Sequence, residues 1–168
     1  MQRVGLGFDV HPFAPREAAR PLVLGGVRFE EERGLAGHSD ADVVVHALCD
    51  ALLGAMGAGD MGGHFPDTDP RYRGVSSVEF LVSVAAMLAG SGWRLVNADL
   101  TVVAEAPRIS PAVPAMRRQI ARPLGVPEEA INVKATRPEG LGALGRGEGI
   151  ACHAIVLISR PGGSVEAG

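Results

Sequence analysis

The apolar positions of the chain fall into stretches with helical spacing and stretches that alternate as strands do. The clearest helical stretch begins near Ser39, where Asp42 and His46 fall one turn apart on one face and apolar residues occupy the opposite face. Ser39 is a residue type favoured at helix N-caps, and Asp42 can act as the acid of a capping box. The pattern predicts a helix that ends near Gly57 or Gly59, with an imidazole and carboxylate stripe opposite its apolar face.

Alternating apolar residues and breaker residues predict the remaining elements. Strands are expected over residues 3–11, 22–29 (a strand pair or one bulged strand interrupted by Gly25 and Gly26), 93–105, 131–135 and 150–159, and helices over residues 78–89 and 112–122. In the 93–105 strand, Leu95 falls on the face opposite Ala98 and both faces are fairly apolar, which indicates a central strand in a sheet covered on both sides. The order of elements predicts an α+β fold, a mixed β-sheet with helices packed on one face.

The length and charge of the chain limit the classes of protein to which it can belong. The 168 residues favour one domain, expected over residues 1–160, followed by a flexible C-terminal tail over residues 161–168. A net charge of −3 argues against nucleic acid or a membrane surface as partner, and no apolar run approaches the ~20 residues of a membrane span. The first residues enter a strand directly, so a cytoplasmic location is expected. Cys49 and Cys152 lie in apolar surroundings and are expected to be buried free thiols.

Three side chains form a candidate metal site. Asp9 and His11 stand two residues apart in the first strand and therefore share a face, and His46 comes from the polar face of the predicted helix. One carboxylate and two imidazoles suit zinc, or another divalent transition metal, with a fourth position open for substrate. Taken separately, the two segments are also consistent with a chance surface pair and with a capped helix whose polar face meets water.

Five segments are specific enough in combination to indicate a family. They are Phe8-Asp9-Val10-His11, His38-Ser39-Asp40-Ala41-Asp42 with His46, Phe65-Pro66-Asp67-Thr68-Asp69, Ala104-Glu105-Ala106-Pro107 and Gly145-Arg146-Gly147-Glu148-Gly149-Ile150-Ala151-Cys152. From about Arg3 to Ser159 the chain resembles the 2-C-methyl-D-erythritol 2,4-cyclodiphosphate synthase family of the non-mevalonate isoprenoid pathway. The resemblance implies that 4-diphosphocytidyl-2-C-methyl-D-erythritol 2-phosphate is cyclised with release of CMP, a phosphorus–oxygen lyase reaction. It also implies a homotrimer in which the subunits pack sheet against sheet.

The resemblance assigns roles to residues at the matching positions. Asp9, His11 and His46 would bind zinc and Glu139 a second cation, Mg²⁺ or Mn²⁺, and with His38 they form the expected catalytic set. His38 and Ser39, at the start of the predicted helix, suit the phosphate end of the substrate. The other residues implied in substrate binding are Asp60 and Gly62 for the erythritol portion, Phe65, Asp67 and Asp69 in a closing loop, Ala104, Ala106, Pro107, Arg108 and Ala135 for cytosine, Thr136 for a phosphate, and Arg146 near the trimer axis.

Two positions depart from the family pattern. Arg137 and Pro138 follow Thr136 where members often have a run of threonines, so one hydroxyl contact to phosphate is lost and Arg137 could supply a charged donor in its place. Ala143 stands where many members carry a phenylalanine that lines a cavity on the trimer axis. Phosphate or an isoprenoid diphosphate is expected to bind in that cavity, more weakly than where the aromatic residue is retained.

Two other functions stay open at this point. One is a metal-dependent phosphohydrolase of a nucleotide-linked substrate. The other is a non-catalytic isoprenoid-binding module with a structural metal, which a closed shell of four protein ligands would support.

Overall fold

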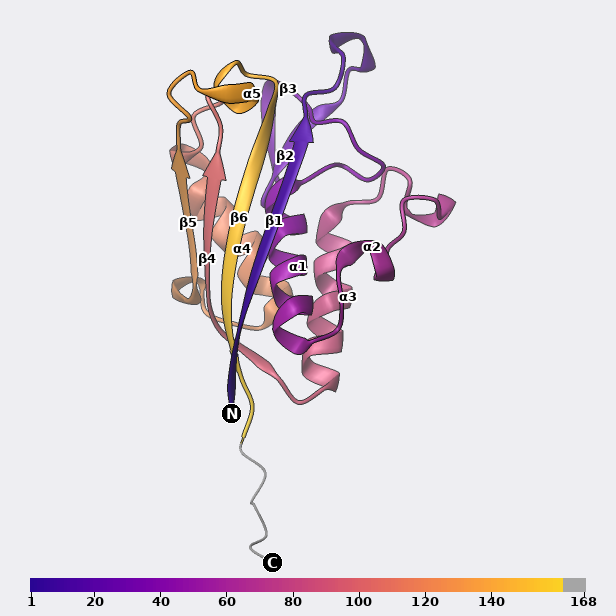
Figure 1. The fold of residues 1–168 in the computed structure, drawn as a ribbon, viewed down its shortest axis with the longest axis vertical. Helices are drawn as coiled ribbons and strands as arrows, with labels where there is room; N and C mark the ends of the chain where they lie inside the picture. The colour runs from indigo at the N-terminus through magenta and orange to yellow at the C-terminus, as the bar shows by residue number, and fades with distance from the viewer. Residues whose placement is uncertain (162–168) are drawn as a thin grey trace, which may run out of the picture.

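The computed structural model describes residues 1–161, which form an α+β fold around a four-stranded sheet (Figure 1). The strands lie in the order β1 (Gln2–Pro12), β6 (Gly149–Ser159), β4 (Arg94–Val103) and β5 (Ile131–Thr136). The pairs β1–β6 and β6–β4 are antiparallel and β4–β5 is parallel, so the sheet is mixed, as predicted. β2 (Pro21–Leu24) and β3 (Val27–Arg33) form a separate hairpin, which confirms the strand-pair interpretation of that segment.

The helices cover one face of the sheet, as expected from the sequence. The long helices are α1 (Val43–Met56), α3 (Ser77–Gly90) and α4 (Val113–Leu124). Figure 1 shows α4 behind β4 and β6, and α1 and α3 to the right of β1. Two helices, α2 (Met61–His64) and α5 (Gly142–Gly145), span only four residues each and lie in connections. Single turns of 3₁₀ helix lie at Arg16–Ala18, Pro70–Tyr72, Ser110–Ala112 and Glu128–Ala130. No helix within residues 1–161 has the length and apolar character needed to cross a membrane.

The other face of the sheet is open within this chain. In β1, Val4, Leu6, Phe8 and Val10 alternate with buried residues and are 48–68% exposed. Ile155 of the neighbouring strand β6 is also exposed. The sequence predicted that both faces of the sheet are covered, but the described residues of this chain cover only one face.

The predicted facing of β4 is wrong at its start. A bulge between Leu95 and Asn97 shifts the register against β6, so Leu95 faces the helices with Ala98 instead of opposing it. Leu95 is 5% exposed, whereas Val96 is 41% exposed. The central position predicted for this strand is correct, since β4 pairs with both β6 and β5.

The first turn of α1 begins later than the sequence predicted. Its N-cap is Asp42, whose carboxylate accepts hydrogen bonds from the backbone N–H groups of Val44 and Val45, and Ser39 lies in the preceding loop. The same buried carboxylate accepts bonds from Gly25 and Gly26 at the turn of the β2–β3 hairpin, at 2.8 and 2.6 Å. These two donors are remote in sequence, and they favour Asp42 over Ser39 as the cap. α1 ends at Gly57 in the left-handed conformation, as expected.

Two glycines of β1 let α1 approach the sheet closely. A Cβ atom at Gly5 would lie 1.9 Å from the carbonyl oxygen of Ala51, and one at Gly7 would lie 1.9 Å from that of Ala47. Only a residue without a side chain fits where two backbones are this close. This contact brings His46, next to Ala47, within reach of the strand residues that follow Gly7.

The remaining sequence expectations concern the cysteines and the tail. Cys49 and Cys152 are buried free thiols, as predicted, and burial raises the pKa of both well above the ordinary value. From residue 162 onward, the tail predicted for residues 161–168 lies outside the described residues.

Candidate metal centre and substrate pockets

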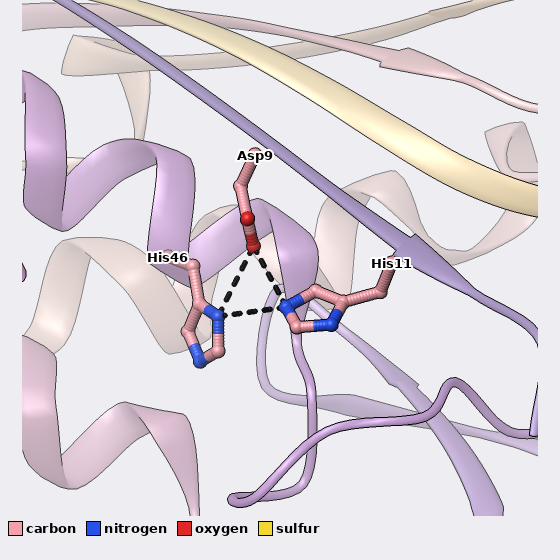
Figure 2. Close-up of side chains that lie close together, drawn as sticks. All are labelled: Asp9, His11 and His46. Atoms are coloured by element: carbon pink, nitrogen blue, oxygen red, sulfur yellow. Dashed lines mark hydrogen bonds and ion pairs between the residues drawn. The ribbon is translucent and has the colours of Figure 1, made fainter. Parts of the chain in front are cut away.

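Asp9, His11 and His46 point toward one another from β1 and α1 (Figure 2). Asp9 Oδ2 lies 3.0 Å from His11 Nε2 and 3.1 Å from His46 Nδ1, and the two ring nitrogens are 3.2 Å apart. The three side chains are partly buried, and among the side chains that the structure describes they are the only cluster of this kind with metal-ligand spacing. The strand periodicity and the helix face predicted from the sequence therefore converge on one point in space.

Hydrogen bonds on the far side of each imidazole indicate which nitrogen faces the cluster as a lone pair. His11 Nδ1 lies 2.8 Å from the carbonyl oxygen of Ala36, an acceptor only, so Nδ1 carries the proton and Nε2 faces Asp9. His46 Nε2 lies 2.9 Å from Ser77 Oγ, which leaves Nδ1 toward Asp9. A carboxylate oxygen and two ring nitrogens that converge in this way repel one another unless a cation or a proton lies between them. The residues present therefore fit a divalent metal.

The close approach of these three groups also shifts the pKa values of Asp9 and His11 when no metal is bound. Burial alone would raise the pKa of Asp9, but hydrogen bonds from His11 and His46 and their charges hold it well below its usual range. Burial alone would lower the pKa of His11, but the hydrogen bond and charge of Asp9 outweigh it and raise that pKa. Without a metal, both shifts thus favour an ion pair between ionised Asp9 and protonated His11.

A cavity of about 510 Å³ opens beside this cluster. Phe65, Tyr72 and Phe80 form one wall, with the Phe65 and Phe80 rings 4.8 Å apart. Asp50, one turn beyond His46, also lines the cavity and accepts a bond from the Met61 N–H group at 2.8 Å, which ties α2 to α1. The residues predicted from the sequence that line it are Asp9, His11, His38, Ser39, His46, Gly62, Phe65 and Asp67.

Two predicted substrate residues serve local structure instead of lining this cavity. Asp60 caps α2 by accepting a bond from the Gly63 N–H group, at 2.9 Å. Asp69 caps the Pro70–Tyr72 turn and pairs with Arg71 at 2.7 Å. His38 lies in the loop before α1 and not at the helix N-terminus, because the helix begins only at Val43. Free N–H groups of α1 are therefore not available to a ligand at His38.

The segments expected to bind cytosine form a second cavity, of about 550 Å³. It lies where β4 and β5 end, and Glu105 and Arg137 line it beside the predicted residues. Since β1 and β5 are the two edges of the sheet, this cavity and the metal-ligand cluster lie at opposite edges of one chain. The predicted residues that line it are Ala104, Ala106, Pro107, Arg108, Ala135 and Thr136.

Glu139 and Arg146 belong to a third, open depression that follows β5. Glu139 is exposed, has a backbone φ of 55°, and does not lie with Asp9, His11 and His46. Arg146 Nε donates to Glu148 Oε1 at 2.6 Å, so its charge is paired within the chain. Within this chain, the structure does not bring the two predicted metal positions together.

Several residues beside the site escaped sequence reasoning. Glu105 accepts bonds from the Gly140 N–H group at 2.6 Å and from Arg137 Nε at 3.2 Å, and so ties the segment before Glu139 to the second cavity. Arg20 donates to the carbonyl oxygens of Gly37 and Ser39 on either side of His38. Ser77 Oγ contacts His46 Nε2, and nothing in the sequence around Ser77 indicates this contact.

Comparisons with known proteins relate the chain to one family. The model of the YgbB family matches residues 2–159. A 2-C-methyl-D-erythritol 2,4-cyclodiphosphate synthase from Geotalea uraniireducens is 52% identical over 158 residues, which cover 94% of this chain and 99% of the relative.

Two solved structures, both with CDP, share the fold. One is described as 2C-methyl-D-erythritol-2,4-cyclodiphosphate synthase in its CDP-bound form; it has a TM-score of 0.83 and 36% identity, covering 94% of this chain and 100% of its own. The other is the IspF CDP complex from Plasmodium falciparum, with a TM-score of 0.83 and 30% identity, covering 96% of this chain and 97% of its own.

Proposed function

The chain belongs to the YgbB family, and on this basis we propose that it forms 2-C-methyl-D-erythritol 2,4-cyclodiphosphate, the product in its relatives' names. The proposed substrate is 4-diphosphocytidyl-2-C-methyl-D-erythritol 2-phosphate, and the second product is CMP. The observation that carries the proposal is the cluster of Asp9, His11 and His46 at the edge of a cavity large enough for a phosphorylated tetritol.

The proposed reaction is an intramolecular displacement at phosphorus. An oxygen of the 2-phosphate forms a bond to the β-phosphorus, the bond from that phosphorus to the oxygen of the α-phosphate breaks, and CMP leaves. Because the nucleophile is tethered, its effective concentration reaches at least about 10⁵ M when the cavity holds it in line. A phosphate dianion needs no deprotonation, so no side chain has to act as a general base.

The residues of the first cavity have matching roles in this proposal. Asp9, His11 and His46 would hold a divalent transition metal such as zinc, which would act as a Lewis acid on a phosphate oxygen. His38 and Ser39 line the same cavity and would donate to the phosphates. The aromatic wall formed by Phe65, Tyr72 and Phe80 would shield one side of the bound substrate from water, which would favour attack by the tethered phosphate over hydrolysis.

The second cavity would hold the cytidine. CDP in two relatives of the same fold supports a nucleotide-binding role. Ala104, Ala106 and Ala135, which line it, would recognise cytosine through backbone groups, while Thr136 and Arg137 would donate to a phosphate. Glu139 would hold the proposed Mg²⁺ or Mn²⁺ together with substrate oxygens, as such ions are usually bound.

We propose that one active site uses two subunits of a homotrimer. With a strand spacing of about 4.8 Å, the edge strands β1 and β5 of the four-stranded sheet lie about 14 Å apart, so the first and second cavities of one chain open at different edges. If the β1 edge of one subunit lies beside the β5 edge of the next, the first cavity of one subunit and the second cavity of its neighbour would form one site. The apolar open face along β1 and β6 supports sheet-to-sheet packing around an axis.

Release of CMP tests whether this protein is an enzyme at all. The purified protein is incubated with the cytidine substrate, Zn²⁺ and Mg²⁺, and CMP is quantified by chromatography, with a chelator-treated sample as control. The proposal requires stoichiometric CMP that chelation abolishes. If CMP does not form although the protein binds zinc and CDP, the chain is a binding module and the proposed activity is wrong.

A further inference from the structure

The buried hydroxyl of Ser77 connects the candidate metal ligand His46 to a carboxylate. Ser77 is the first residue of α3 and is fully buried. Its Oγ lies 2.9 Å from His46 Nε2 and donates a short hydrogen bond to Asp40 Oδ1. The Ser77 N–H group also donates to Asp40 Oδ2, at 3.1 Å. Three segments of the chain thus meet at one hydroxyl.

The proton positions in this chain of contacts follow from the chemistry of the groups. An ionised carboxylate only accepts, and a serine hydroxyl has one proton to give. Because Ser77 gives that proton to Asp40, its Oγ faces His46 as an acceptor. His46 Nε2 must then carry the ring proton, and the lone pair on Nδ1 points at Asp9 and His11. Ser39 Oγ lies 3.2 Å from His46 Nε2 and 3.4 Å from Ser77 Oγ. If Ser39 gives its single proton to Ser77, its oxygen is a second acceptor for the proton on Nε2.

We propose that Ser77 and Asp40 are positioning residues that fix the tautomer and orientation of His46, so that its Nδ1 is ready to bind metal before metal arrives. The inference rests on the metal role proposed above for Asp9, His11 and His46. For His11 the tautomer is fixed by the backbone carbonyl of Ala36, which accepts from Nδ1 and cannot reorient. For His46 the order depends on a side-chain carboxylate two hydrogen bonds away, and substitution can change it.

The first test reads the tautomer directly in the unsubstituted, zinc-free protein. Long-range proton–nitrogen correlation spectra of protein with ¹⁵N-labelled histidine distinguish protonated from unprotonated ring nitrogens, in alkaline buffer where the ring is neutral. The signals of His46 are identified by their loss in His46→Ala. A proton on Nε2 is expected, and a proton on Nδ1 overturns the proposal.

The second test changes the two positioning residues and measures zinc affinity by competition with a chelating dye. The Ser77 N–H and O–H groups donate to different oxygens of Asp40, and in Asp40→Asn one of these two positions becomes an NH₂ donor. The hydroxyl is then free to turn toward His46, which shifts the ring proton to Nδ1. Loss of an outer partner of a metal-bound imidazole typically lowers metal affinity about 10- to 100-fold, and this loss is expected for both Asp40→Asn and Ser77→Ala.

Ser83→Ala is the matched control, because it removes an exposed hydroxyl from the same helix that donates only to the Glu79 carbonyl. It should keep parental zinc affinity. Circular dichroism establishes that each variant is folded. If Ser77→Ala does not fold, Asp40→Asn and the tautomer spectrum still decide the matter. Parental zinc affinity in the folded variants refutes the positioning role, whereas an unsubstituted protein that binds no zinc refutes the metal role itself.

Discussion

The close contact between β1 and α1 predicts that a single methyl group at Gly7 disrupts the candidate metal centre. In Gly7→Ala, the new Cβ would lie 1.9 Å from the carbonyl oxygen of Ala47 and 2.7 Å from the backbone nitrogen of Ala51. Neither atom belongs to a flexible side chain. The helix must therefore move away from the strand by more than about 1 Å to reach an ordinary contact distance.

This displacement has two measurable consequences. Overpacking of this kind costs about 1–3 kcal/mol, which corresponds to roughly 2–12 °C in melting temperature for a chain of this size. Because His46 is carried by α1, the same movement separates Nδ1 from Asp9 by several times the ~0.2 Å tolerance of a metal–ligand distance. Zinc affinity should therefore fall by more than tenfold.

The assay combines thermal unfolding of the zinc-free protein with zinc titration against a chelating dye. Gly54→Ala is the control, since Gly54 lies in α1 and a Cβ there meets nothing within 4 Å. It should raise stability by about 1 kcal/mol, because alanine is the better helix former, and leave zinc affinity unchanged. If Gly7→Ala keeps both the melting temperature and the zinc affinity of the parent, the close approach does not set the geometry of the site.

Three further predictions concern the proposed roles. His46→Ala should lower zinc affinity and CMP release by more than about 100-fold, which exceeds the effect of losing a residue that only hydrogen-bonds to a metal ligand. Equal CMP release from this variant and the parent would exclude His46 as a zinc ligand needed for the reaction. An inactive His46→Ala subunit mixed with an inactive Thr136→Val subunit should regain part of the activity if sites are shared between chains, and no recovery in demonstrably mixed trimers would argue against sharing. Zinc affinity should fall about tenfold per pH unit below the pKa of His11, which Asp9 raises above 6.5, because zinc must displace that proton. Because the pKa of His11 is higher in the folded than in the unfolded chain, His11 contributes fully to the stability of the zinc-free protein below about pH 6.5. This contribution is lost as the pH rises through the folded pKa. Isothermal titration with zinc and denaturant unfolding, both over pH 5–9, check the direction of the two pH effects.

Local sequence patterns predicted the long helices and the strands, and also the candidate metal ligands that these elements carry. Asp9 and His11 follow from strand alternation, and His46 from the helix face, because in each case the period of the element decides where a side chain points. The alternation of β4 misled at Leu95, since a bulge is set by pairing with β6 and not by the residues themselves.

Interactions between segments far apart in sequence could not be predicted in this way. Asp42 became the helix cap because Gly25 and Gly26 supply two more donors to its carboxylate. Ser77 meets His46 only because α3 packs beside α1. The position of the two cavities at opposite edges depends on the strand order, which residue periodicity does not encode.

The central claim, ring closure, is tested most directly by phosphorus NMR of the reaction mixture. The purified protein is given the cytidine substrate with Zn²⁺ and Mg²⁺, and spectra are recorded until the substrate is consumed. The account predicts two coupled diphosphate resonances of a cyclic product together with the resonance of CMP. Resonances of CMP and a linear methylerythritol bisphosphate would mean that water attacks the β-phosphorus, and would identify the protein as a phosphohydrolase instead.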